Sequence, residues 1–297
     1  MLQQTRVAAA LPFYERFMKR FPTVAELAQA VEADVLGHWA GLGYYSRARN
    51  VHKASQFVCA AGGIFPDRHQ ALLDLPGVGD YTAAAIGSIA FDLPHAAVDG
   101  NLLRVLARLD NDPSDIGNTR TRARFTERAQ ELLDPLHPGD FNQAMMELGA
   151  TVCVPKTPRC GECPVENFCE GRAAGRQTEL PVKSGRQAKV EIDVVALVIR
   201  QGDCILLKQR SAGAGQMAGF WELPDAAAMP MARVGAPLGE VRHTITHHHY
   251  RYEVRAAALL GTTASAPYAW KRWNKLDELL LTTAAKKALR LAAQKRE

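Results

Sequence analysis

Four unequally spaced cysteines are the residues of this chain best suited to hold a metal centre. The sequence contains six cysteines, and four of them, Cys153, Cys160, Cys163 and Cys169, form the pattern C-x6-C-x2-C-x5-C. Four thiolates in one short loop satisfy the ligand count of tetrahedral zinc and of a [4Fe–4S] cluster alike. Zinc sites more often pair their cysteines in two short C-x2-C units, so this spacing favours iron–sulfur over zinc.

A second group of residues with chemical potential lies between positions 75 and 101. The segment 75–79 reads LPGVG, in which one proline fixes φ and two glycines accept backbone angles that other residues avoid, so a tight hairpin between two helices is predicted. The N–H groups and positive dipole end of the following helix can bind a phosphate, although a plain helical corner fits the same letters. Farther on, 98–101 reads VDGN, where Asp99 is either a helix N-cap or a reactive carboxylate.

Apolar periodicity predicts the elements that must position these groups. Residues 1–170 show the helical period almost throughout, with a capping threonine at Thr23 followed by Glu26. Between 171 and 189, polar and basic residues replace this pattern and predict a linker. Beyond it, 192–199, 204–207 and 250–260 read as strands and 283–294 as a helix. We therefore predict a multidomain protein: an all-α domain over 1–170, a linker over 171–189 and an α+β domain over 190–297.

Composition agrees with two globular domains. The chain has 297 residues, of which 47% are hydrophobic and 23% charged, and its formal net charge is +5. This mild basicity permits a nucleic-acid partner without requiring one. No apolar run approaches the roughly 18 residues of a membrane span, and no signal peptide begins the chain, so we expect a cytoplasmic protein with no membrane partner.

Together, the hairpin, the aspartate and the cysteine pattern resemble the endonuclease III superfamily of helix-hairpin-helix DNA glycosylases. MLQQT at 1–5, GLGYYSRARN at 41–50 and the second domain are similar to its adenine-specific branch, so the resemblance covers nearly the whole chain. It implies a glycosylase domain with a [4Fe–4S] cluster on the four cysteines, followed by a MutT-like (Nudix-fold) domain. It also implies a monomeric base-excision repair enzyme that flips adenine out of A:8-oxoguanine or A:G pairs in double-stranded DNA and hydrolyses its N-glycosidic bond.

The resemblance assigns catalytic roles to three residues. Asp99 would stabilise the positive charge that develops on the sugar as the purine leaves, as a carboxylate does in glycoside hydrolysis. Asn101 would support this carboxylate by hydrogen bonding. Tyr81 stands where bifunctional relatives carry a lysine, and because a tyrosine cannot form a Schiff base, we expect a monofunctional enzyme without strand cleavage.

The resemblance also names residues that would touch DNA. Gln4 and Tyr44 would insert beside the lesion, the amides of Gly77 and Gly79 would grip a phosphate, Gln143 would lie near the adenine edge, and Thr246 and His247 would meet 8-oxoguanine. Where the family has Phe-Ser-His, residues 245–247 read Ile-Thr-His, so the aromatic contact is lost. The second domain lacks the clustered glutamates of a Nudix hydrolase, so we expect no phosphohydrolase activity.

One element of the family pattern is absent. The family places a glutamate, the general acid for adenine departure, two residues before the methionine of MLQQT, and this chain begins at that methionine. Without this proton donor we expect a rate loss of about 10²- to 10⁴-fold. Our hypothesis is a start codon assigned too late, which an in-frame stop immediately upstream would contradict. Two alternatives stay open: a protein that binds A:8-oxoguanine without cleavage, and an endonuclease III-like glycosylase of other specificity.

Overall fold

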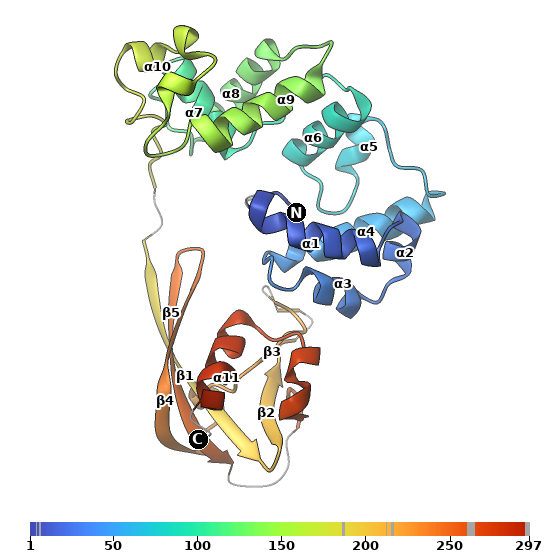
Figure 1. Cartoon of the computed structure of the whole chain (residues 1–297), viewed down its shortest axis with the longest axis vertical. Helices are drawn as coiled ribbons and strands as arrows, with labels where there is room; N and C mark the ends of the chain where they lie inside the picture. The colour runs from blue at the N-terminus through green and yellow to red at the C-terminus, as the bar shows by residue number, and fades with distance from the viewer. Residues whose placement is uncertain are drawn as a thin grey trace. The chain divides into compact units, whose positions relative to one another are not determined.

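The computed structural model describes residues 1–3, 5, 7–185, 188–211, 213–214, 217–259 and 265–294. By internal contacts the chain forms two compact units, one from 1–20, 30–49 and 187–297 and the other from 21–29 and 50–186. In the described part, α-helices occur along the chain up to residue 173, the strands begin at residue 190, and one more α-helix follows the last strand (Figure 1). The predicted order, all-α and then α+β, is confirmed, while the exact domain boundaries remain a prediction. No described helix is both long and apolar enough to cross a bilayer.

The first four helices follow the predicted apolar period. They are α1 (Val7–Arg20), α2 (Val24–Gln29), α3 (Glu32–Trp39) and α4 (Tyr45–Ala60). The hydroxyl of Thr23 accepts the backbone N–H of Glu26 at 3.2 Å, so the predicted cap of α2 is confirmed. Phe17 of α1 meets Trp39 of α3 edge to face, with ring centroids 5.7 Å apart. This pair anchors the loop that follows Trp39.

Six further described α-helices precede the strands. They are α5 (His69–Leu73), α6 (Asp80–Phe91), α7 (Gly100–Leu109), α8 (Thr119–Leu132), α9 (Pro138–Glu147) and α10 (Glu170–Ala173). Every residue from Leu102 to Arg108 in α7 is buried, and Phe125 and Ala129 of α8 belong to the same core. A π-helical turn, Leu148–Val152, follows α9 and leads to the first cysteine of the pattern. Helix α7 therefore follows its N-cap Asp99 directly, and its last turn carries Arg108, which donates to Cys153 Sγ.

Part of the predicted linker is bound to these helices. Leu180 is 1% exposed, and its carbonyl accepts the buried Arg108 Nε–H at 2.9 Å. The carbonyl of Val182 accepts the N–H of Ile116 at 3.0 Å. Although this segment is polar and basic on average, the buried side chain of Leu180 attaches it to the helices.

The second half of the chain forms a mixed six-stranded sheet. Its strands are β1 (Val190–Gln201), β2 (Cys204–Gln209), β3 (Trp221–Glu222), β4 (Ala232–Ile245), β5 (His248–Leu259) and β6 (Tyr268–Arg272). The order is β3-β2-β1-β5-β4, with β6 beside β2. Strands β1 and β5 run parallel, whereas β4 and β5 form an antiparallel hairpin (Figure 1). Helix α11 (Thr283–Gln294) buries Ala285, Ala288 and Leu289 in the core it shares with the sheet.

Candidate active site and iron–sulfur centre

Asp99 is the N-cap of α7. Its Oδ1 accepts the backbone N–H groups of Asn101 and Leu102 at 2.9 and 2.8 Å, and its Oδ2 accepts the Asn101 side-chain amide at 3.0 Å. Three hydrogen bonds therefore fix the orientation of a half-buried carboxylate. The N-cap role does not exclude the predicted catalytic role, because the cap itself holds the carboxylate in place.

Tyr81 lies beside this carboxylate. It stands in the first turn of α6, and its hydroxyl donates to Met146 Sδ at 3.5 Å. Burial, and then the negative charge of Asp99, raises the pKa of Tyr81. The structure thus brings together all three predicted catalytic residues. Gln143, by contrast, is exposed on α9 and donates to the Gly139 carbonyl of its own helix at 3.2 Å.

The hairpin before α6 needs its first glycine for two reasons. Gly77 has a φ of +77°, and a Cβ there would lie 2.2 Å from Asn50 Nδ2. Gly79 is the N-cap of α6 and has no side chain to accept the N–H groups of the first turn. A helix N-terminus whose cap supplies no side-chain acceptor is the arrangement that suits an anion.

Asn142 is a buried site residue that the sequence reasoning missed. Its side chain is 1% exposed and donates to Ser88 Oγ at 2.8 Å and to the His95 carbonyl at 2.9 Å. Its oxygen accepts the Ala97 N–H at 2.9 Å. These bonds hold the segment that leads into Asp99 against α6 and α9. The only local signal was an asparagine beside Gln143, which does not distinguish a buried amide from a solvated one.

Arg104 connects the Asp99 site to the cysteine loop and was also missed. Its guanidinium donates to Asn101 Oδ1 at 3.0 Å, to the Gly149 carbonyl at 2.8 Å and to the Cys153 carbonyl at 2.9 Å. Burial lowers the pKa of Arg104, and the neighbouring Cys153 and Asp99 oppose this shift. A continuous path of hydrogen bonds therefore runs from the Asp99 carboxylate to the first cysteine.

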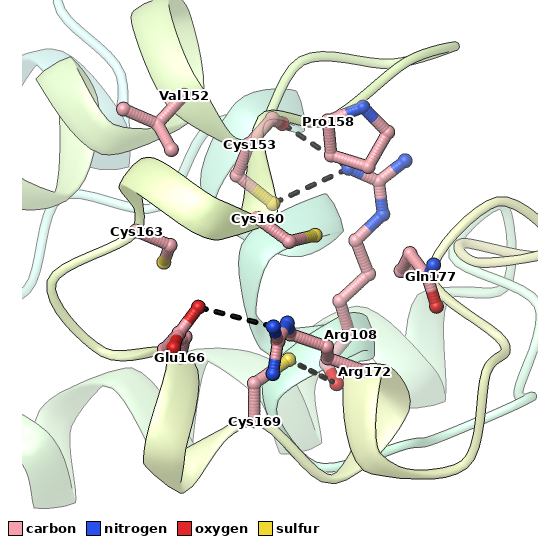
Figure 2. A pocket seen from close by; sticks show the side chains of 10 residues that line it. All are labelled: Arg108, Val152, Cys153, Pro158, Cys160, Cys163, Glu166, Cys169, Arg172 and Gln177. Carbon is pink, nitrogen blue, oxygen red and sulfur yellow. Dashed lines mark hydrogen bonds and ion pairs between the residues drawn. The ribbon is translucent and has the colours of Figure 1, made fainter.

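The four cysteines line one cavity (Figure 2). Arg108, 2% exposed, reaches into its wall and donates to Cys153 Sγ at 3.3 Å and to the Val154 and Pro155 carbonyls at 2.9 and 2.7 Å. Arg172 also lines the cavity and pairs with Glu166 at 3.3 Å. Two guanidinium groups thus line the cavity of the four cysteines and can balance the negative charge of thiolates.

The donor set fits an iron–sulfur cluster. Burial raises the pKa of the Cys160 and Cys163 thiols, and neighbouring cysteine sulfurs add to this effect. Metal binding would deprotonate the thiols and relieve the cost of crowding four of them together. An N–H donated to a ligand sulfur, as Arg108 donates to Cys153, is also a feature that tunes such clusters. When bound, the cluster supplies iron–thiolate bonds that link the four cysteines of the loop to one another.

The predicted lesion-contacting residues belong to the other compact unit. Tyr44 is 54% exposed and has a positive φ of 49°. Thr246 occupies the turn between β4 and β5 with a φ of 56°, and its hydroxyl donates to the Ile245 carbonyl at 2.7 Å. The neighbouring His247 lies 4.0 Å from His248, ring centroid to ring centroid. Gln4 lies outside the described residues.

Comparison with known proteins defines the class. Residues 1–131 match the HhH-GPD superfamily of base excision DNA repair proteins, and residues 153–169 match the iron-sulfur binding domain of endonuclease III. A solved thermostable thymine-DNA glycosylase is similar with a TM-score of 0.51 and 26% identity, covering 58% of this chain and 80% of that one. A non-covalent endonuclease III–DNA complex has the same fold, with a TM-score of 0.50 and 24% identity over 58% of this chain and 80% of that one. Fold and site together define a DNA-binding helix-hairpin-helix glycosylase.

The relatives identify the family within this class. The adenine DNA glycosylase of Rattus norvegicus is 36% identical over 365 residues, covering 100% of this chain and 70% of the relative. That of Mus musculus is 35% identical and covers 100% of this chain and 71% of the relative. The chain belongs to the adenine DNA glycosylase family. Its cofactor is a [4Fe–4S] cluster, so the zinc alternative falls away.

Proposed function

We propose that this protein removes adenine from A:8-oxoguanine and A:G pairs in double-stranded DNA, acting as a monofunctional monomer. The observation that carries the proposal is the Asp99 carboxylate, fixed by three hydrogen bonds beside a tyrosine in place of an amine. The names of the relatives supply the base, adenine.

Asp99 is the group that would act on the sugar. As the N-glycosidic bond breaks, positive charge develops on the deoxyribose, and a fixed carboxylate lowers the energy of that state without reorganising. The side-chain amide of Asn101 donates a hydrogen bond to the second carboxylate oxygen of Asp99 and keeps the carboxylate in a fixed orientation. Tyr81 cannot form a Schiff base, so water completes the reaction and the strand stays intact.

The other predicted residues would hold the DNA. The amides after Gly77 and Gly79 would bind a backbone phosphate, which sets register without reading sequence. Gln143 would approach the flipped adenine, and Gln4 with Tyr44 would fill the space left in the duplex. Thr246 and His247 would contact 8-oxoguanine from the exposed β4–β5 turn.

A single-turnover assay on an A:8-oxoguanine duplex tests the proposal. We expect Asp99→Asn to lower base release at least about 10²-fold and to leave duplex binding intact, since the amide retains the capping oxygen and loses the charge. Asp134→Asn is the matched control, because Asp134 also accepts a backbone N–H, from Leu136 at 2.9 Å, but lies exposed. Its rate should stay within about twofold of wild type, as is usual for exposed positions.

Two results would contradict the proposal. Base release by Asp99→Asn at the wild-type rate would exclude the carboxylate from the chemistry. Strand cleavage by the wild type without alkali treatment would show a lyase step and refute the monofunctional assignment. Duplexes that carry an oxidised pyrimidine test for another base specificity. Faster release of the oxidised pyrimidine than of adenine would refute adenine as the substrate.

A further inference from the structure

The loop before α4 holds Tyr44 in an unfavourable backbone conformation. Tyr44 has a φ of 49°, a region that side-chain-bearing residues rarely occupy, and its ring is 54% exposed. Trp39 Nε1–H donates to the Gly43 carbonyl at 2.9 Å, and the Gly41 N–H donates to the Tyr45 hydroxyl at 3.3 Å. The buried rings of Trp39 and Tyr45 thus brace the loop, so the strain at Tyr44 is imposed by its surroundings.

Arg47 joins this loop to the start of the chain. Its guanidinium carbon lies 4.9 Å from the centroid of the Tyr44 ring and 5.8 Å from that of Trp39. Its Nη1 donates to the Met1 carbonyl at 3.1 Å and also to the Gln3 carbonyl, while Nη2 lies 3.4 Å from Thr5 Oγ1. One side chain therefore contacts both the MLQQT motif and the exposed tyrosine.

The surroundings of the Arg47 side chain cost stability. Arg47 is half-buried, and this burial lowers the pKa of its guanidinium. Its Nε–H is buried and has no acceptor within the described part of the chain. A buried N–H without a partner costs free energy and calls for an explanation. The unsatisfied Arg47 Nε–H and the strained backbone of Tyr44 therefore both cost stability at the same place in the structure.

Arg16 shows what an ordinary structural arginine does in the same compact unit. It is exposed, and it donates to the His38 carbonyl from Nε at 3.2 Å and from Nη2 at 2.8 Å, and to the Ala40 carbonyl at 3.3 Å. Its guanidinium stacks 4.9 Å from the Phe13 ring. Arg16 and Arg47 thus have similar numbers of partners, but only the contacts of Arg47 converge on an exposed aromatic side chain.

We propose that Arg47 is a positioning residue for lesion recognition: by its contacts with Met1, Gln3 and Thr5 it holds the start of the chain and the Tyr44 ring as one preformed unit before DNA binds. This inference rests on the proposed function for the purpose of Tyr44, and on the contacts of Arg47 for the clamp itself. A preformed unit pays less ordering entropy on binding than one assembled on the duplex, so the benefit should appear as selectivity for the mispair.

Hydrogen exchange on the free protein tests the clamp without DNA. The variants are Arg47→Met, which removes all donors, Arg47→Lys, which keeps the charge over the ring, and Arg16→Met as the matched control, each with its purification tag at the C-terminus. We expect amides in peptides covering 1–5 and 41–46 to exchange at least about 10-fold faster in Arg47→Met, less so in Arg47→Lys, and at the wild-type rate in Arg16→Met. Unchanged exchange in Arg47→Met would overturn the clamp.

Binding to two duplexes then tests the purpose of the clamp. The readout is the Kd for undamaged DNA divided by the Kd for an A:8-oxoguanine duplex, measured on proteins with equal cluster content. We expect this ratio to fall about 10-fold in Arg47→Met, to recover in part in Arg47→Lys and to stay unchanged in Arg16→Met. An equal loss of affinity for both duplexes would overturn the inference, because it would make Arg47 a simple phosphate contact. A wild-type ratio near one would refute the proposed function instead, while the exchange data still decide the clamp.

Discussion

Replacing Arg104 with methionine should disturb the cysteine loop and the Asp99 site together. Arg104 is 7% exposed, and its guanidinium serves three acceptors: Asn101 Oδ1 at 3.0 Å, the Gly149 carbonyl at 2.8 Å and the Cys153 carbonyl at 2.9 Å. Methionine is similar in length and preserves packing around the apolar stem, but it supplies no donor. The substitution therefore isolates the hydrogen bonds from the volume of the side chain.

The magnitude follows from the acceptors left behind. A buried acceptor that loses its donor costs about 1–3 kcal/mol, but three that share one donor do not add fully, so we expect a loss of about 3–5 kcal/mol in the free energy of unfolding. Only the bond to Asn101 bears directly on Asp99. Losing about 1–2 kcal/mol of that support corresponds to a roughly 5- to 30-fold lower single-turnover rate of adenine release.

The assay follows urea unfolding by the visible absorbance of the cluster, with iron content and adenine release measured on the same preparation. Arg128→Met is the control, because Arg128 is 40% exposed and forms surface ion pairs with Asp110 and Glu131, which are worth at most about 1 kcal/mol. We expect a lower urea midpoint and less iron in Arg104→Met only. A midpoint equal to that of the control would refute the network as a source of stability, and a wild-type rate would refute its link to Asp99.

Three further predictions follow. Asn142→Ala should lower the free energy of unfolding by about 2–4 kcal/mol and slow adenine release, because a 1%-exposed amide loses three bonds; an unchanged urea midpoint would contradict its buried role. Burial, and then His69, lowers the pKa of His95, so its stabilising neutral form is fully present above about pH 6.5 and is lost as pH falls below that value. The urea midpoint of His95→Gln should therefore fall less than that of wild type between pH 7.5 and 5.5, and an equal fall would exclude His95 as the cause. Gly77→Ala forces an alanine to a φ of +77° and should weaken binding to any duplex about 10-fold or more by anisotropy, whereas Gly37→Ala, with open space around its Cβ, should bind normally; equal affinities would argue against the hairpin as a phosphate site.

The helices could be predicted well because their signals are local. The cap at Thr23, the glycine at position 77 and the final helix Thr283–Gln294 depend on residues within one or two turns of each other, and the structure has each of them. Strand β4 was not predicted, because glycine and proline between positions 235 and 239 interrupt the alternation of side chains. Its pairing with β5 shifts register at Pro237, and that pairing is what makes the segment a strand.

The domain pattern shows a related limit. The segment 171–189 reads as a polar linker, yet Leu180 is fully buried through contacts with a helix more than 70 residues earlier. Composition reports the average of a segment, and one anchoring side chain barely alters that average. Whether Leu180 is buried depends on the helical surface that packs against it in the folded protein.

By itself the sequence predicted the cysteine ligand set, the phosphate-type hairpin and the carboxylate at Asp99, because each prediction depends on residue type and spacing along a short stretch. Only the tertiary structure decided which arginines and amides support them. Arg104 and Cys153 are 49 positions apart, and Asn142 and Ala97 are 45 apart. On a helix with the usual apolar period, a polar residue looks the same whether it faces water or a buried carbonyl. The difference arises only when packing removes the water and leaves one acceptor within reach.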